Sequence, residues 1–169
     1  MTFCLDDFSN AEQSSFGTRW LLFSDQSLGG QSQAEADYAQ EPKRVKIAGL
    51  LSPDFEPCFV QWVLPLVHSR YLFDAKHFEG VYIAYRSAHT HLFLTLRSKE
   101  LSMPWQHYRI ALPTQSECIQ QKFSLKDFLP YGTDHGLNPE RLSRIGLMAE
   151  APSEAKQNFE FELAEIGFY

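Results

Sequence analysis

Short stretches in which hydrophobic and polar residues alternate run through most of this chain. Residues 44–51, 81–86, 91–97 and 105–112 alternate with the spacing that places successive side chains on opposite faces of a strand. Residues 58–64 form a more continuous apolar run, typical of a strand covered on both faces. Turn-prone residues separate these segments at roughly eight- to twelve-residue intervals, as in sandwiches and barrels. We therefore predict an all-β fold, a two-sheet β-sandwich of about nine or ten strands.

Two segments carry the signals of a single helical turn instead. Ser124 can cap a turn over residues 125–128, because its hydroxyl can accept a hydrogen bond from a backbone N–H at the start of the turn. Asn138 is a second capping residue, with Pro139 in the first helical position, where its missing N–H costs nothing. Residues 130–139 form the longest exposed loop that the pattern predicts.

The segment from Trp20 to Ser32 departs most clearly from simple alternation. Its start is short, apolar and aromatic and predicts a buried strand, and Asp25 then opens a turn by accepting hydrogen bonds from N–H groups one or two residues on. Gly29 and Gly30 permit positive φ or a close approach of another segment. A phosphate-binding loop would need a different glycine spacing and a following helix, so we interpret the segment as a structural turn.

This turn also resembles the signature of a known family, the complex I intermediate-associated proteins. Members carry Asp-Gly-Val-Met-Gly-Gly-x-Ser, and this chain keeps Asp25, Gly29, Gly30 and Ser32, has Leu28 for the Met, and departs at Gln26 and Ser27. Three further segments are similar to the family's opening, its Pro-containing stretch and its closing strand: residues 5–8, 123–130 and 159–166.

The resemblance implies a fold and a role. The fold is a jelly roll like the galactose-binding domains and many carbohydrate-binding modules, here one domain over residues 1–169. The role is non-catalytic and assembly-factor-like, with another protein as the partner, as in members that assist assembly of respiratory complex I in mitochondria. The family's mitochondrial members carry transit peptides, and the segment around Asp6 and Asp7 is unlike one.

Composition narrows the alternatives. Fifteen basic and twenty-one acidic residues give a net charge of −6, which argues against nonspecific binding to nucleic acid. Three cysteines without Cys-x-x-Cys spacing argue against a disulfide framework and favour a reducing compartment. We see no secretion signal and no apolar run long enough to insert into a membrane, so we expect a cytoplasmic protein.

Three of the alternating strands suggest a binding surface. If they are neighbours, one sheet face carries aromatic rings beside Arg and His donors, and no carboxylate from these strands. The candidate ligand- or partner-binding residues are Tyr82, Arg86, His91, Phe93, Arg97, Trp105, His107 and Arg109. Such a face suits a sugar ring, through stacking, or a small anion, through charge-assisted hydrogen bonds. The alternative is a solvated face with ordinary cross-strand pairs. The arginines are predicted to be free for a ligand.

Other chemistry is weakly indicated. His89 and His91 lack a third zinc ligand at a suitable spacing, so we expect no zinc, and we assign no metal site and no cofactor. Asp25, Asp54 and Asp74 could supply oxygen ligands but match no calcium loop, and a structural calcium is left open. We identify no nucleophile motif and assign no catalytic residue. An enzyme that uses the same aromatic and basic face remains the third hypothesis, after a protein-binding and a sugar- or anion-binding protein.

Overall fold

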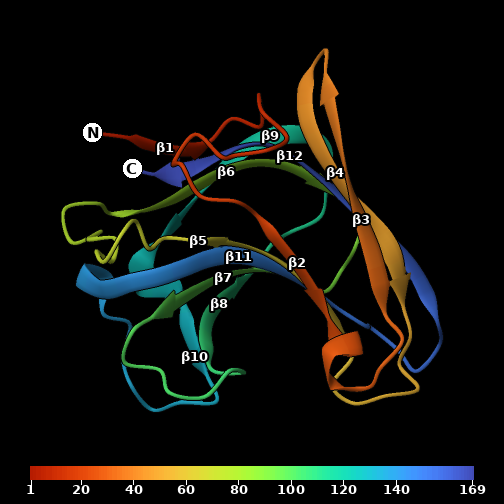
Figure 1. Cartoon of the computed structure of the whole chain (residues 1–169). Coiled ribbons are helices and arrows are strands. Elements are labelled where there is room, and N and C mark those ends of the chain that lie inside the picture. The colour runs from red at the N-terminus through yellow and green to blue at the C-terminus, as the bar shows by residue number, and fades with distance from the viewer.

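The computed structural model describes residues 1–169 and contains two antiparallel six-stranded sheets packed face to face (Figure 1). Strands hold 53% of the residues and short helical turns only 6%. Sheet A contains β1 (Phe3–Asp6), β3 (Gln33–Gln40), β4 (Lys43–Leu51), β6 (Gly80–Ser87), β9 (Gln115–Ser124) and β12 (Gln157–Phe168). Sheet B contains β2 (Leu21–Ser24), β5 (Phe59–Pro65), β7 (Leu92–Ser98), β8 (His107–Ala111), β10 (Leu129–Tyr131) and β11 (Leu142–Glu150). The predicted all-β sandwich is confirmed.

The order of strands within each sheet differs from their order along the chain. Sheet A runs β3-β4-β12-β6-β9, with β1 pairing on β12, and sheet B runs β10-β8-β7-β11-β5-β2. In Figure 1, β10 and the turn that follows β2 lie below the middle strands of sheet B, at the two ends of the sheet. No helix has the length and apolarity to cross a bilayer.

The core fills the space between the sheets with one cluster of 29 buried hydrophobic residues. Alternation along the strands supplies it: Ile47 and Phe161 point inward from sheet A, and Leu94 and Leu147 from sheet B. At roughly 25 cal/mol per Å² of apolar surface removed from water, this cluster is the main stabilising contribution to the fold.

Three short 3-10 turns accompany the strands: η1 (Asp25–Leu28), η2 (Leu125–Asp127) and η3 (Pro139–Arg141). The predicted caps of the last two are confirmed. The Ser124 hydroxyl accepts from the Lys126 N–H, and Asn138 Oδ1 accepts from the Glu140 N–H.

Trp20 does not belong to a buried strand, which corrects that prediction. It lies just before β2, and Leu21, Leu22 and Phe23 of that edge strand are each about two-fifths exposed. The Trp20 ring stacks on Trp62, with centroids 3.9 Å apart, and its Nε1 donates to Asp6 Oδ2 at 2.7 Å. Trp20 therefore anchors the edge strand, while the strand itself stays open to solvent.

The glycine turn is structural, but it works differently from the prediction. Asp25 is fully buried, and its carboxylate accepts from the distant Ser32 N–H at 2.9 Å and Phe59 N–H at 3.1 Å rather than from its near neighbours. Gly29 has the positive φ of +105°, whereas at Gly30 the constraint is space. A Cβ at Gly30 would lie 2.3 Å from Asp25 Oδ1.

Candidate binding face on sheet B

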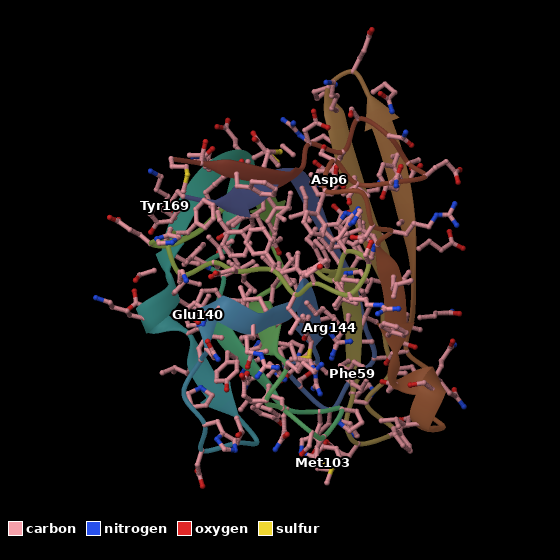
Figure 2. All side chains as sticks on the ribbon, turned by 60° about the vertical axis from the view of Figure 1, so that its left-hand side comes forward. Asp6, Phe59, Met103, Glu140, Arg144 and Tyr169 are labelled. Atoms are coloured by element: carbon pink, nitrogen blue, oxygen red, sulfur yellow. The ribbon has the colours of Figure 1, made fainter.

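The outer face of sheet B, which points away from the core, carries aromatic rings, arginines and a histidine side by side. Cross-strand partners share a face, so the register fixes its members. From β2 to β10, the side chains include Leu21, Phe23, Phe59, Gln61, Val63, Arg144, Met148, Glu150, Phe93, Thr95, Arg97, His107, Arg109, Leu129 and Tyr131. Figure 2 shows Phe59 and Arg144 on the same side of the molecule as the loop that carries Met103.

The centre of this face is closed and its edges are open. Val63, Thr95, Met148 and His107 keep 8% or less of their surface exposed, although none points into the core. The surrounding apolar side chains are exposed between 40% and 68%, and we call them the apolar rim: Leu21, Phe23, Met103, Trp105, Leu129 and Tyr131. Clustered exposed apolar side chains of this size are typical of binding surfaces.

Arg97 holds the loop that covers one side of the face. Its guanidinium donates to four backbone carbonyls of residues 101–106, at distances of 2.7–3.2 Å: Leu101, Met103, Pro104 and Gln106. Burial lowers the pKa of Arg97. With both terminal guanidinium nitrogens bound to loop carbonyls, Arg97 is part of the structure of the face, which corrects the prediction that it is free for a ligand.

Arg109 is also occupied, by a carboxylate from a strand that the sequence did not place here. Its Nη1 lies 2.6 Å from Glu150 Oε1. Its Cζ lies 4.1 Å from the Phe93 ring centroid and 4.4 Å from that of Tyr131. The guanidinium is therefore held by an ion pair and two cation–π contacts, and it covers part of both rings.

His107 is buried against these arginines with one nitrogen unpaired. Nδ1 lies 2.8 Å from the carbonyl oxygen of Trp105, and Nε2 has no hydrogen-bond partner. Burial, together with the charges of Arg109, Arg144 and Arg97, lowers the pKa of His107 from 6.5 to about 4. Because a carbonyl oxygen can only accept, Nδ1 carries the proton of the neutral ring and Nε2 presents a lone pair.

Arg144 is the cation of this face without a partner. No ion pair or hydrogen bond to its guanidinium is present, and its pKa is lowered by burial and by the charge of Arg97, its direct cross-strand partner. A cavity of about 10 Å³ lies between these groups, and its walls include Gln61, Thr95, Arg97, Gln106, His107 and Arg144. We call it the Arg144–His107 notch.

A larger open groove lies on the other sheet. It has a volume of about 850 Å³ over β3, β4 and β12, and small residues such as Ala34 and Gly49 line it. His89 lines this groove. Its Nε2 is hydrogen-bonded to the backbone carbonyl oxygen of Glu150 at 2.8 Å, and its Nδ1 has no hydrogen-bond partner. No cationic side chain lines this groove. The outer face of sheet B combines rings, cations and an unpaired imidazole, so it is the stronger candidate.

A known family model matches almost the whole chain. Residues 7–164 match the model of Complex I intermediate-associated protein 30 (CIA30). The chain belongs to the CIA30 family. The matched region includes the glycine turn and every strand of sheet B, and thus the whole candidate face. No curated protein matches the chain.

Solved structures similar to this CIA30 protein are jelly rolls. One is the family 11 carbohydrate-binding module of the cellulosomal cellulase Lic26A-Cel5E of Clostridium thermocellum, with a TM-score of 0.75, 12% identity, and coverage of 99% of this chain and 94% of that chain. The same module in complex with a β-1,3-1,4-mixed-linked tetrasaccharide gives a TM-score of 0.70 with the same identity and coverage. At this identity the likeness establishes the jelly-roll fold.

The CIA30 fold brings half of the predicted site residues together. Phe93, Arg97, His107 and Arg109 share the outer face of sheet B, and Trp105 lies on its rim. His91 lies just before β7, with Nδ1 on the Thr90 hydroxyl. Strand β6 was expected beside β7 but lies in sheet A. The remaining two predicted residues, Tyr82 and Arg86, therefore project from sheet A.

Those two residues have partners of their own on sheet A. Tyr82 donates to Glu165 at 2.9 Å, and Arg86 forms ion pairs with Glu160 and Glu162. Both side chains thus pair with carboxylates of the neighbouring strand β12, which is the cross-strand alternative that the sequence left open, although Tyr82 is buried rather than solvated. The sequence reasoning missed Arg144, Glu150 and Tyr131, although the alternation of Arg144, Gly146, Met148 and Glu150 along one strand was visible.

The histidines and aspartates that the sequence analysis considered as metal ligands lie apart from one another. No three His, Cys, Asp or Glu side chains meet in an arrangement that could hold a metal ion. His89 and His91 make separate contacts, and the Asp25 carboxylate is occupied by backbone N–H groups.

The depressed pKa of His107 should appear in the pH dependence of stability. Between about pH 6.5 and pH 4 the unfolded ring binds a proton and the folded ring does not, so stability falls as the pH falls through this window. The stability of the variant His107→Phe, which keeps a ring beside Tyr131, should fall less steeply with decreasing pH. We would compare denaturant unfolding of the two proteins across the window. Parallel curves would contradict the assignment, since the carboxylates titrate in both proteins.

Arg144→Gln should leave the fold intact and raise its stability by up to about 1 kcal/mol, because it removes a like charge directly opposite Arg97. Thermal unfolding at low and high salt measures this, and the gain should shrink as salt screens the repulsion. Arg44→Gln on sheet A serves as the matched control for removing a charge. A clear loss of stability in Arg144→Gln would mean that Arg144 stabilises the fold.

Proposed function

We propose that this protein is a non-catalytic binding protein that holds another protein against the outer face of sheet B. The observation that carries the proposal is the apolar rim around a closed, cationic centre. Large exposed aromatic and aliphatic side chains that a partner can bury are the kind of anchor residues from which protein interfaces draw much of their affinity. The family name refers to a protein associated with complex I intermediates, and we propose a role of that class, the holding of an assembling protein.

Two features of the rim favour a protein over a sugar. Stacking on a sugar needs an open aromatic ring face, and two rings of this surface are partly covered: Arg109 lies over Phe93 and Tyr131, and His107 stacks on Tyr131 with centroids 4.8 Å apart. The rim also contains aliphatic side chains, Leu21 and Leu129, which suit a protein surface.

Binding to a sugar is the second candidate. Phe59, Gln61 and Glu150 lie on the same face, and a carbohydrate-binding module of the same fold is known in complex with a tetrasaccharide. Thermal-shift screening against oligosaccharides tests this candidate. A saturable shift that disappears in Gln61→Ala would favour it over the protein partner.

The main experiment compares variants of the rim in partner capture. Bait protein is incubated with lysate of its own source, and bound proteins are quantified by mass spectrometry. The double variant Phe23→Ser, Leu129→Ser should capture at least about tenfold less of the partner than the wild type does. The reason is that truncation of an interface anchor typically costs more than about 1 kcal/mol of binding free energy. Ile119→Ser, an equally exposed apolar residue on sheet A, is the matched control and should capture normally.

The outcome separates the surfaces. If the rim variant captures the partner as well as the wild type, the proposed binding face is wrong. Equal losses in the Ile119→Ser control would indicate a general effect of exposed apolar surface instead. In the first case the groove over β3, β4 and β12 is the next surface to test.

A further inference from the structure

The Arg144–His107 notch contains two polar groups that the fold leaves unsatisfied. Arg144 has N–H donors without an acceptor, and His107 Nε2 is a buried acceptor without a donor. His107 Nε2 is buried, whereas the Arg144 side chain is only partly buried. Buried polar atoms in native proteins are almost always paired, so an unpaired Nε2 beside a guanidinium without an acceptor indicates that another group completes them. Both lie on the face that we propose as the binding surface, and this inference rests on that proposed function.

The chemistry of the missing group follows from the two atoms that it must meet. It has to accept a hydrogen bond from Arg144 and donate one to His107 Nε2. A carboxylate supplies only acceptors, and its lone pairs would face the lone pair of Nε2 unless the ring took up a proton. With its pKa near 4, the ring is neutral at physiological pH, so this uptake is unfavourable.

Size and charge agree with an uncharged group. The notch has a volume of about 10 Å³, enough for one atom of the size of a hydroxyl oxygen or an amide nitrogen. The neighbouring charge of Arg97 is already surrounded by four carbonyl oxygens, and that of Arg109 by Glu150. Arg144 therefore needs a hydrogen-bond acceptor, but the notch does not need a carboxylate from the ligand in addition to Glu150.

We propose that the Arg144–His107 notch is a specificity site that receives an uncharged side chain of the partner protein, an Asn or Gln amide. The amide oxygen accepts from the Arg144 guanidinium, and the amide NH₂ enters the notch and donates to His107 Nε2. Acidic side chains are excluded at neutral pH by His107, and aliphatic side chains by the two polar groups that they would leave buried and unpaired.

The first test uses small probes on the intact protein and does not need the partner. ¹⁵N-labelled protein is titrated separately with acetamide, sodium acetate and methyl β-glucopyranoside at constant ionic strength. Nuclear magnetic resonance follows the Arg144 Nε–H and the His107 ring nitrogens. Acetamide should shift both in a saturable manner at pH 7, and the shift should be lost in Arg144→Gln and retained in the control Arg44→Gln.

Each other outcome overturns the proposal. If acetate shifts both groups and His107 becomes protonated, the notch is an anion site. If the glucoside shifts both and acetamide does not, it is a sugar subsite. If no probe shifts either group, the notch holds a structural water only.

The second test separates this inference from the proposed function. Arg144→Gln and His107→Phe are compared with the rim variant in capture of the partner. The inference predicts a loss of at least about tenfold in both notch variants. In Arg144→Gln a hydrogen bond to a charged group is removed, and in His107→Phe the partner's amide N–H is left buried without an acceptor. If the notch variants capture normally while the rim variant fails, the binding face stands and the notch proposal is wrong. If all of them capture normally, both are wrong.

Discussion

Gly30→Val is expected to lower the free energy of unfolding by about 3–5 kcal/mol, a large effect for one substitution at a surface turn. The reason is the position of Asp25. A Cβ at residue 30 would lie 2.3 Å from Asp25 Oδ1 and 2.6 Å from its Cγ, so the buried carboxylate would have to move. Urea unfolding monitored by tryptophan fluorescence measures the change.

The cost is large because the Asp25 carboxylate joins three separate segments. It accepts from Ser32 at the end of the turn and from Phe59 at the start of β5. Hydrogen bonds to a charged group contribute about 1.5–3 kcal/mol each, and a buried carboxylate that loses them has no access to water in exchange. Phe59 is also the first residue of β5 on the candidate binding face, so its position depends on this contact.

Two glycines provide controls for this prediction. Gly29→Ala tests backbone strain alone, because Gly29 has a φ of +105° and a new Cβ would have ordinary contact with Phe55; about 1 kcal/mol is expected. Gly136→Val adds the same side chain where nothing lies within 4 Å and should be nearly neutral. If Gly30→Val matches Gly136→Val, the contact with Asp25 does not hold the turn.

Local patterns predicted the elements of this fold well. The period-two segments became strands, and the caps at Ser124 and Asn138 formed as expected, because these features depend on neighbouring residues alone. The glycine turn was also recognised as structural, but the role of Gly30 depends on a carboxylate that folds back against it. That contact is set by packing and leaves no local pattern.

The candidate site was predicted only in part because sheet order is a long-range property. Strands β6 and β7 follow each other along the chain, yet one lies in sheet A and the other in sheet B. Strand β7 lies between β8 and β11, and β11, which is more than forty residues away in the sequence, brings Arg144 and Glu150. Glu150 pairs with Arg109, so the charge compensation that three strands lacked came from a fourth.

The other large effect concerns Arg97, whose replacement by Ala should lower the free energy of unfolding by about 2–4 kcal/mol. Four hydrogen bonds from one guanidinium to loop carbonyls would be lost. Part of that loss is offset, because water can reach the loop and the repulsion between Arg97 and Arg144 disappears. Arg97→Lys should be nearly as destabilising, since one ammonium cannot reach all four carbonyls in the geometry of the guanidinium.

Arg97→Ala should also change His107, and this readout distinguishes the loop from the fold in general. The carbonyl of Trp105, which holds His107 Nδ1, belongs to the loop that Arg97 fixes. Release of the loop exposes the ring to water and removes one neighbouring positive charge, and both changes raise the pKa of His107 from about 4 toward 6.5. Histidine titration by nuclear magnetic resonance measures it, with the wild-type protein as the reference. If His107 still titrates near pH 4 in Arg97→Ala, the loop is held by other contacts and Arg97 is available to a ligand, as the sequence alone had suggested.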